Sequence, residues 1–273
     1  MKHYTRSEVD ISVQRPPPNV EAADSVRRGA LSQVRELIKS GVSPDCRDDG
    51  GCTLLMIACE TGHYPVAKLL LDNGADANAR NSDGKTALMY AAQHGAKTTA
   101  ELLADRGAKI EATNVCGATA LGFAAEAGND EIVKLLLDKG AHVNSVENMG
   151  ATPLISASEE GQLSTVKLLL DNGASLDQAR CDGQNAMMQA VLYNNNEVVL
   201  CLVKRGAAVN LKNKFGDTCL GTAIENSNFE IVEILIDYHA DVNLVSRGKS
   251  PLTLAREGRD KRIVELLTRA GAR

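Results

Sequence analysis

A glycine recurs every 33 residues through most of this 273-residue chain. Its positions are Gly51, Gly84, Gly117, Gly150, Gly183 and Gly216. A second glycine keeps the same period from Gly74 to Gly206. A fixed period of this length is typical of a stack of similar units, each of which buries its apolar face only against its neighbours. The repeat therefore predicts an elongated array instead of one globule around a central core.

Signals within one unit predict two helices and a projecting turn. Thr119 stands two residues after Gly117 and is suited to cap a first helix over 121–125. Gly128 permits a tight turn into a second, amphipathic helix over 131–137. The stretch 141–149 then has the turn residues of a hairpin, which we call a finger.

The period divides the chain into an N-terminal arm and one array. Residues 1–18 fall outside it, and we expect a flexible arm in which Pro16, Pro17 and Pro18 exclude a helix. Residues 19–273 form the array, and Ser250 is the expected N-cap of its last unit. The expected capping repeats at the two ends are 19–50 and 249–273. The internal repeats are 51–83, 84–116, 117–149, 150–182, 183–215 and 216–248.

The residues also carry a family resemblance. The segment Thr152 to Ala157, TPLISA, resembles the T-P-L-H-x-A signature of ankyrin repeats, which share the 33-residue period. A GAD-type segment that ends at Asn78, Asn144 and Asn210 strengthens the resemblance, which covers about 20–273. It implies an all-α solenoid of helix-turn-helix units with short β-hairpin fingers. It also implies a structural hydrogen bond for His63.

The pattern loosens toward the C-terminus. The turn glycine is replaced by Asn194 and Ser227, and the glycine that ends the second helix is replaced by His239. Asn tolerates the left-handed backbone region, whereas Ser and His each cost about 1 kcal/mol there. We therefore expect the last three units to open before the centre of the array.

Charge and cysteine content limit the class of protein. Residues 247–273 carry eight Lys or Arg and three Asp or Glu, a net of +5, which leaves −10 for the preceding 246 residues. An acidic body argues against nucleic acid as the main ligand. Seven cysteines without a CxxC pair indicate reduced thiols in the cytoplasm, with the nucleus as an alternative compartment. The sequence contains no run of 18 apolar residues and therefore predicts no membrane span. We expect a monomer.

Catalytic, cofactor and metal sites are not predicted. Gly84-Lys85-Thr86 resembles the end of a phosphate-binding loop, but Ala79 stands where that loop needs a glycine. No His, Cys or carboxylate cluster has metal-ligand spacing, and no nucleophile has a recognisable base. The basic C-terminal unit is either a soluble outer face or a dock for an acidic partner or nuclear-import factor.

The resemblance implies that a partner lies along the concave side of the array. Family members contact ligands with the exposed C-terminal ends of the first helices and with the finger tips. The helix-end candidates are Glu60, His94, Glu126, Glu159, Glu160, Leu192, Tyr193 and Glu225. The tip candidates are Arg80, Val115, Val146, Met149 and Phe215. The glutamates predict an acidic floor, and the apolar tips predict anchors, unless those side chains fold against neighbouring fingers.

These features favour an interaction scaffold or adaptor whose partner segment carries Lys or Arg beside an apolar anchor. An occluding inhibitor, or a regulatory subunit of an enzyme or transcription factor, is the alternative. An enzyme or small-molecule-binding protein would need convergent polar groups that the sequence does not show. A mechanical spacer would need only plain polar tips, unlike Met149, Tyr193 and Phe215.

Overall fold

The computed structural model describes residues 18–273. The predicted flexible arm lies outside this range except for Pro18, which begins helix α1 (Pro18–Arg27). The expectation that Pro18 is not helical is therefore wrong. Proline suits the first position of a helix because its φ is already helical and its missing N–H would have no partner there.

The described residues form sixteen helices that follow one another in pairs, with no continuous strand. After α1 come α2 (Leu31–Lys39), α3 (Leu54–Glu60), α4 (Tyr64–Asp72), α5 (Ala87–Gln93), α6 (Lys97–Asp105), α7 (Ala120–Glu126) and α8 (Asp130–Asp138). The second half contains α9 (Pro153–Glu159), α10 (Leu163–Asp171), α11 (Ala186–Leu192), α12 (Asn196–Lys204), α13 (Cys219–Glu225), α14 (Phe229–Asp237), α15 (Pro251–Gly258) and α16 (Lys261–Arg269). This is the expected all-α repeat stack.

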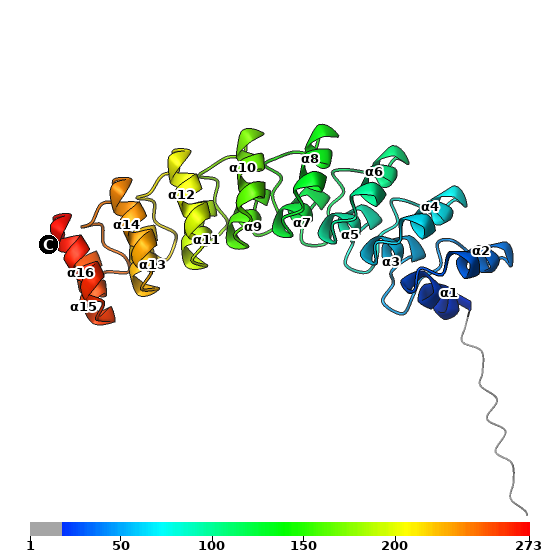
Figure 1. Cartoon of the computed structure of the whole chain (residues 1–273), viewed down its shortest axis with the longest axis horizontal. Coiled ribbons are helices and arrows are strands. Elements are labelled where there is room, and N and C mark those ends of the chain that lie inside the picture. Colours follow the sequence, from blue (N-terminus) through cyan, green and yellow to red (C-terminus); the bar gives the residue numbers. More distant parts are fainter. Residues whose placement is uncertain (1–17) are drawn as a thin grey trace, which may run out of the picture.

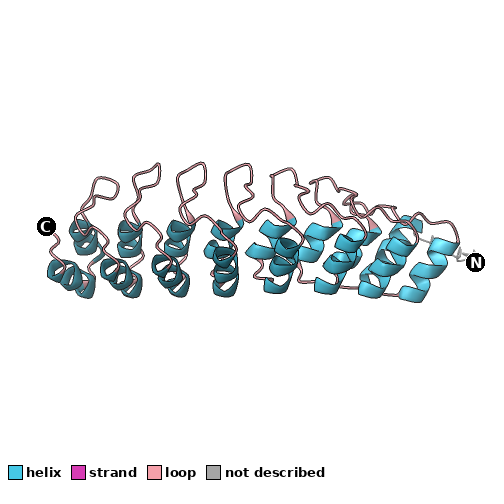
Figure 2. Ribbon diagram, turned by 90° about the horizontal axis from the view of Figure 1, so that it is seen from above, coloured by secondary structure: helices cyan, strands magenta, loops and turns pink. Residues whose placement is uncertain are grey.

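The pairs stack into a gentle arc (Figure 1). The first helix of each pair, from α3 to α13, lies on the inner side of the arc, and the second helix lies on the outer side. Figure 2 shows the loops between pairs projecting from one side of the stack as a row of fingers. First helices and fingers therefore border one continuous surface, which we call the inner face.

The first helices begin at the predicted caps. The Thr119 side chain accepts from the Gly122 amide at 3.3 Å, and Asn185 accepts from the Met188 amide at 3.0 Å. Thr53, Thr152, Thr218 and Ser250 make the corresponding bonds. At Thr86 the Met89 amide donates to the backbone carbonyl of Thr86 at 3.1 Å. These bonds satisfy helix-end amides that would otherwise lack a partner.

The core consists of small and aliphatic side chains shared between neighbours. In α3 every residue from Leu54 to Cys59 is buried, whereas α8 buries only Ile132, Val133 and Leu136 on one side. The inner row is covered on both sides because each first helix packs against the preceding and the following one, as α7 does with α5 and α9. Each fully buried Leu or Ile contributes about 1.5–3 kcal/mol.

The fingers are joined to one another by backbone hydrogen bonds. The amide of Val115 donates to the Asp83 carbonyl at 2.9 Å, and the amide of Cys181 donates to the Met149 carbonyl at 2.8 Å. Within a finger only isolated β-bridges form, such as the antiparallel bridge between Lys212 and Thr218. Such a bridge closes the fingers over 47–53, 179–185, 212–218 and 246–249, whereas another finger is closed by a hydrogen bond from the Asn81 amide to the Lys85 carbonyl at 3.1 Å.

A row of polar side chains fastens several of the first helices to the turn of the following unit. Asn195 donates to the carbonyls of Ser158 and Glu159 at 2.9 and 2.8 Å, and Asn129 does the same for Ala92 and Gln93. The expected hydrogen bond of His63 is also present, between its Nε2 and the Arg27 carbonyl at 3.1 Å. The row is interrupted where Ala96 occupies the same position.

A second row explains the asparagines of the GAD-type segments. Asn78 Nδ2 donates to the Gly107 carbonyl at 3.0 Å, while its Oδ1 accepts from the Lys109 amide at 2.8 Å. Asn144 and Asn210 bind the next unit in the same way. Each asparagine thus satisfies one donor and one acceptor of the adjacent unit and fixes the register between them.

The C-terminal third contains the backbone irregularities. Asn194, Ser227 and His239 have φ of 59°, 55° and 66°, in the left-handed region that the sequence predicts for them. Arg247 and Arg259 also have positive φ, which was not predicted. Within residues 18–273 these five are the non-glycine residues in that region, and all lie after residue 193.

We expect Ser227→Gly to stabilise the C-terminal units by about 1 kcal/mol, because glycine adopts positive φ without a Cβ clash. In the parent protein, amide hydrogen exchange should show the units over 183–273 opening before those over 51–116. In the variant, exchange in α13 and α14 should be slower. Asn194→Gly is the matched control and should gain less, since Asn tolerates the same backbone. Earlier opening of residues 51–116 would contradict this view.

The polar row that contains Asn195 generates a second prediction. Asn195→Ala should lower the free energy of unfolding by about 1–2 kcal/mol, because the carbonyls of Ser158 and Glu159 lose their donor. Ala96→Asn should restore the missing bond to the end of α3 and raise the urea midpoint. The space beside Gly62 is empty and can take the new side chain. Asn73→Ala, which removes only an exposed bond to the Leu69 carbonyl, serves as control. Equal losses for Asn195→Ala and Asn73→Ala would refute the role assigned to the row.

Candidate partner-binding face

The C-terminal ends of α7 and α9 bring several glutamates together at the middle of the inner face. Glu126, Glu147, Glu159 and Glu160 line a hollow of about 250 Å³, together with Met149 and Arg180. We call this the glutamate hollow. Its four carboxylates and one guanidinium give a net charge of −3 when all are ionised.

Proton affinities in the glutamate hollow reflect this crowding. Partial desolvation raises the pKa of Glu126, and the charges of Glu160 and Glu159 raise it further against the opposing effect of Lys85. Desolvation also raises the pKa of Glu147, helped by Glu126 and opposed by Arg180. Both carboxylates are therefore ionised at a free-energy cost, which a cation placed among them would reduce.

Arg180 and Tyr193 lie on the inner face one repeat after Glu147 and Glu160. Arg180 Nη1 is 3.7 Å from Glu159 Oε2, and both side chains are about three-quarters covered. Glu159 also interacts with the Tyr193 hydroxyl and raises the pKa of Tyr193. The floor thus holds a guanidinium of the chain itself beside a carboxylate and an aromatic ring.

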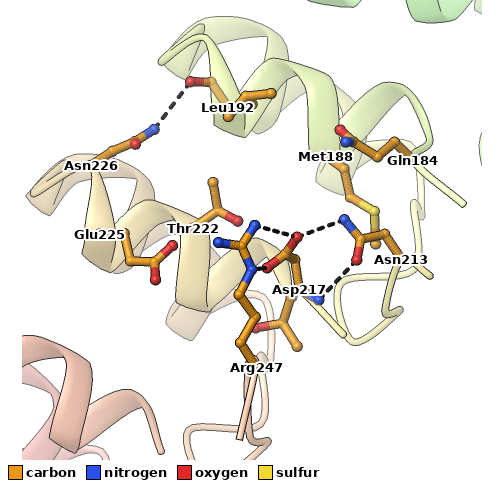
Figure 3. Close-up of a pocket in the computed structure, with 10 residues that line it drawn as sticks. Gln184, Met188, Leu192, Asn213, Asp217, Thr222, Glu225, Asn226 and Arg247 are labelled. Carbon is orange, nitrogen blue, oxygen red and sulfur yellow. Dashed lines mark hydrogen bonds and ion pairs between the residues drawn. The ribbon is translucent and has the colours of Figure 1, made fainter. Parts of the chain in front are cut away.

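A second hollow, of about 270 Å³, lies farther toward the C-terminus between α11 and α13 (Figure 3). Its wall includes Met188 and Leu192 from α11 and Thr222 and Glu225 from α13, and we call it the Leu192 hollow. Arg247 from the following finger pairs with Asp217, donating through Nη2 to Oδ2 at 2.9 Å.

The Asp217 carboxylate is further held by Asn213, whose Nδ2 donates to Oδ2 at 2.8 Å (Figure 3). The charge of Asp217 is therefore neutralised within the chain. Glu225 is exposed and has no ion-pair partner among the described residues, so it supplies the uncompensated charge of this hollow.

Lys85 occupies the N-terminal part of the inner face. Its Nζ lies 4.5 Å from the centre of the Phe123 ring and 5.6 Å from that of Tyr90, and it donates to Gln93 Oε1 at 3.3 Å. A cation over an aromatic face is stabilised by the ring quadrupole. Lys85 thus bends from its finger onto the floor, a role that the sequence did not indicate.

The predicted apolar anchors, and Leu192 at the end of α11, are exposed. Their exposed fractions lie between 41% and 65% for Val115, Val146, Met149, Leu192, Tyr193 and Phe215. Leu211 and Val245 are also exposed and were missed. Val245 could have been found from the period, because it stands three repeats after Val146 at the same finger position.

The remaining predicted residues lie outside the two hollows, except for Glu225. Glu60 and His94 are exposed at the ends of α3 and α5. Arg80 is exposed on its finger, and its guanidinium lies against Gly84. Glu147 and Arg180 were missed as floor residues, although both replace an asparagine that recurs at Asn81, Asn114 and Asn213.

That asparagine closes its own finger. The Oδ1 of Asn114 accepts from the amides of Cys116 and Ala118, at 3.0 and 2.8 Å. Asn213 makes equivalent bonds to Phe215 and Asp217. Where Glu147 and Arg180 replace it, the longer side chain reaches the floor instead.

Across residues 18–273 no group of three or more His, Cys, Asp or Glu side chains is placed to hold a metal ion. All seven cysteines are free thiols. In the same part of the chain no helix has the length and apolarity needed to cross a membrane.

Comparison with known proteins agrees with the geometry. A family model described as "Ankyrin repeats (3 copies)" matches residues 22–114, 110–180 and 187–273. A search of curated proteins gives no match.

We expect Glu126→Gln to raise the melting temperature at pH 7 by about one or two degrees. A carboxyl whose pKa is raised on folding destabilises the folded state once it ionises, so the penalty exists above the raised pKa. Below pH 4.5, which equals the ordinary pKa of a glutamate, the carboxyl is increasingly protonated in both states, and the advantage of the variant should fade. Glu60→Gln, at the end of α3, is the control. A gain that persists at pH 3, or that Glu60→Gln shares, would contradict the assignment.

Proposed function

The chain belongs to the ankyrin repeat family, and on that basis we propose that it is a scaffold or adaptor that binds a partner segment on its inner face. Ankyrin repeats generally mediate protein–protein interactions. The segment proposed here carries Lys or Arg beside an apolar side chain. The observation that carries the proposal is the glutamate hollow, in which four carboxylates lie beside the exposed thioether of Met149.

Charge and exposure both support this assignment. A cationic side chain would offset the desolvation and the mutual repulsion that raise the pKa of Glu126 and Glu147. Met149 and Tyr193 are exposed next to the same carboxylates, and exposed Met and aromatic residues are common anchors at interfaces. The free thiols of all seven cysteines favour a reducing compartment, the cytoplasm or the nucleus.

We expect the variant Met149→Ala/Glu159→Lys/Glu160→Lys to lose capture of partner proteins by at least about tenfold, without a large change in melting temperature. The three positions are only partly buried or exposed, so the core is untouched. The measurement is quantitative affinity capture from cells, with circular dichroism to verify folding.

The matched control is Asp138→Lys/Glu233→Lys, which makes the same change in net charge on α8 and α14 of the outer row. It should retain the partners that the inner-face variant loses. If both variants capture the same proteins as the parent chain, the inner face is not the binding surface.

A further inference from the structure

The two hollows of the inner face are one feature of the repeat, displaced by two units. Glu126, Glu147 and Glu159 of the glutamate hollow correspond to Leu192, Asn213 and Glu225 of the Leu192 hollow, always 66 residues or two periods apart. Ser156 and Thr222 also correspond, so both hollows have a hydroxyl at the same place. They therefore lie on a common line along the floor, with the same orientation to the stack.

The equivalent position between them is taken by side chains of the chain itself. One repeat after Glu147 the chain has Arg180, and one repeat after Glu160 it has Tyr193. Both interact with Glu159. A partner segment would therefore place side chains into the glutamate hollow and the Leu192 hollow and pass over Tyr193 between them.

Each hollow combines carboxylate charge with an apolar wall. The glutamate hollow has Met149 beside a net charge of −3, and the Leu192 hollow has Leu192 and Met188 beside Glu225. Because Arg247 already neutralises Asp217, Glu225 supplies the remaining charge of the second hollow. A long basic side chain suits both, since its aliphatic stem packs on the apolar wall while its charged end reaches the carboxylates.

The repeat spacing sets the distance between the two basic residues. Packed helices lie roughly 8–10 Å apart, so two units separate the hollows by roughly 16–20 Å. An extended chain advances about 3.3 Å per residue, which corresponds to five or six residues. Six is an even number, so both side chains leave an extended backbone on the same side.

Resting on the function proposed above, we propose that the inner face reads an extended partner segment with two basic residues six positions apart. The first, an arginine or lysine, enters the glutamate hollow beside Met149. The second lies along Leu192 with its charged end at Glu225. An uncharged residue between them crosses the exposed ring of Tyr193.

The test uses fluorescein-labelled peptides of sixteen residues in a Ser/Thr/Ala background. Each carries two arginines separated by three, six, nine or eleven positions, and a fifth peptide carries one arginine. Fluorescence anisotropy at physiological salt should give the highest affinity at a separation of six, about fivefold above the single-arginine peptide. Since all two-arginine peptides have equal charge, non-specific attraction predicts no such maximum.

Two variants make the assignment specific. Glu225→Gln should remove the advantage of the six-position peptide while leaving the single-arginine peptide unchanged. Glu126→Gln/Glu160→Gln should weaken every peptide. Equal affinities at all separations, no binding to any peptide, or a maximum at eleven, which suits a helix, would overturn the proposal.

Failure of this proposal can be separated from failure of the proposed function. If capture of cellular partners still depends on Met149, Glu159 and Glu160 while the peptide series is flat, the inner face binds partners but not in this register. If capture does not depend on those residues, the function itself is wrong.

Discussion

Apolar contact between neighbouring helix pairs is the interaction on which the other features of this chain depend. α7 has seven residues, and all except Glu126 are buried, so hardly any side of it faces water. Such a short helix is unstable alone, and one partner helix cannot cover it. α5 and α9 provide the cover from both sides, so the free energy of each unit is available only when its neighbours are folded.

Apolar contact is not directional, and the polar rows supply the missing specificity. Asn129 and Asn195 bind the end of the preceding first helix, while Asn78, Asn144 and Asn210 bind the start of the next finger. A unit that slipped along its neighbour would leave these carbonyls and amides without partners. The two rows therefore hold the first helices in register, and this register aligns the two hollows of the inner face.

The sequence predicts the architecture well because the architecture is periodic. Spacing indicated the helix pairs, the cap at Thr119 and the left-handed positions at Ser227 and His239, whereas the cap at Ser250 stands one residue before the period and was found from its residue type. Side chains that depart from the period were harder to place. Glu147, Arg180 and Lys85 stand on fingers, and only the three-dimensional arrangement shows that they bend onto the floor. Pro18 was misjudged because the helix-breaking effect of proline does not apply at the first position of a helix.

The glutamate hollow is hard to explain by folding alone. On the outer side of the array several charges are paired, as where Arg106 binds Asp72 at 2.6 Å and Arg205 binds Asp171 at 2.8 Å. At the centre of the inner face four carboxylates instead share one guanidinium, and the pKa of two of them is raised. An asparagine at position 147 would close the finger, as Asn114 and Asn213 do, and remove one of these charges. Glu147 thus gives up a local bond and adds repulsion, and a cation bound beside it would offset that cost.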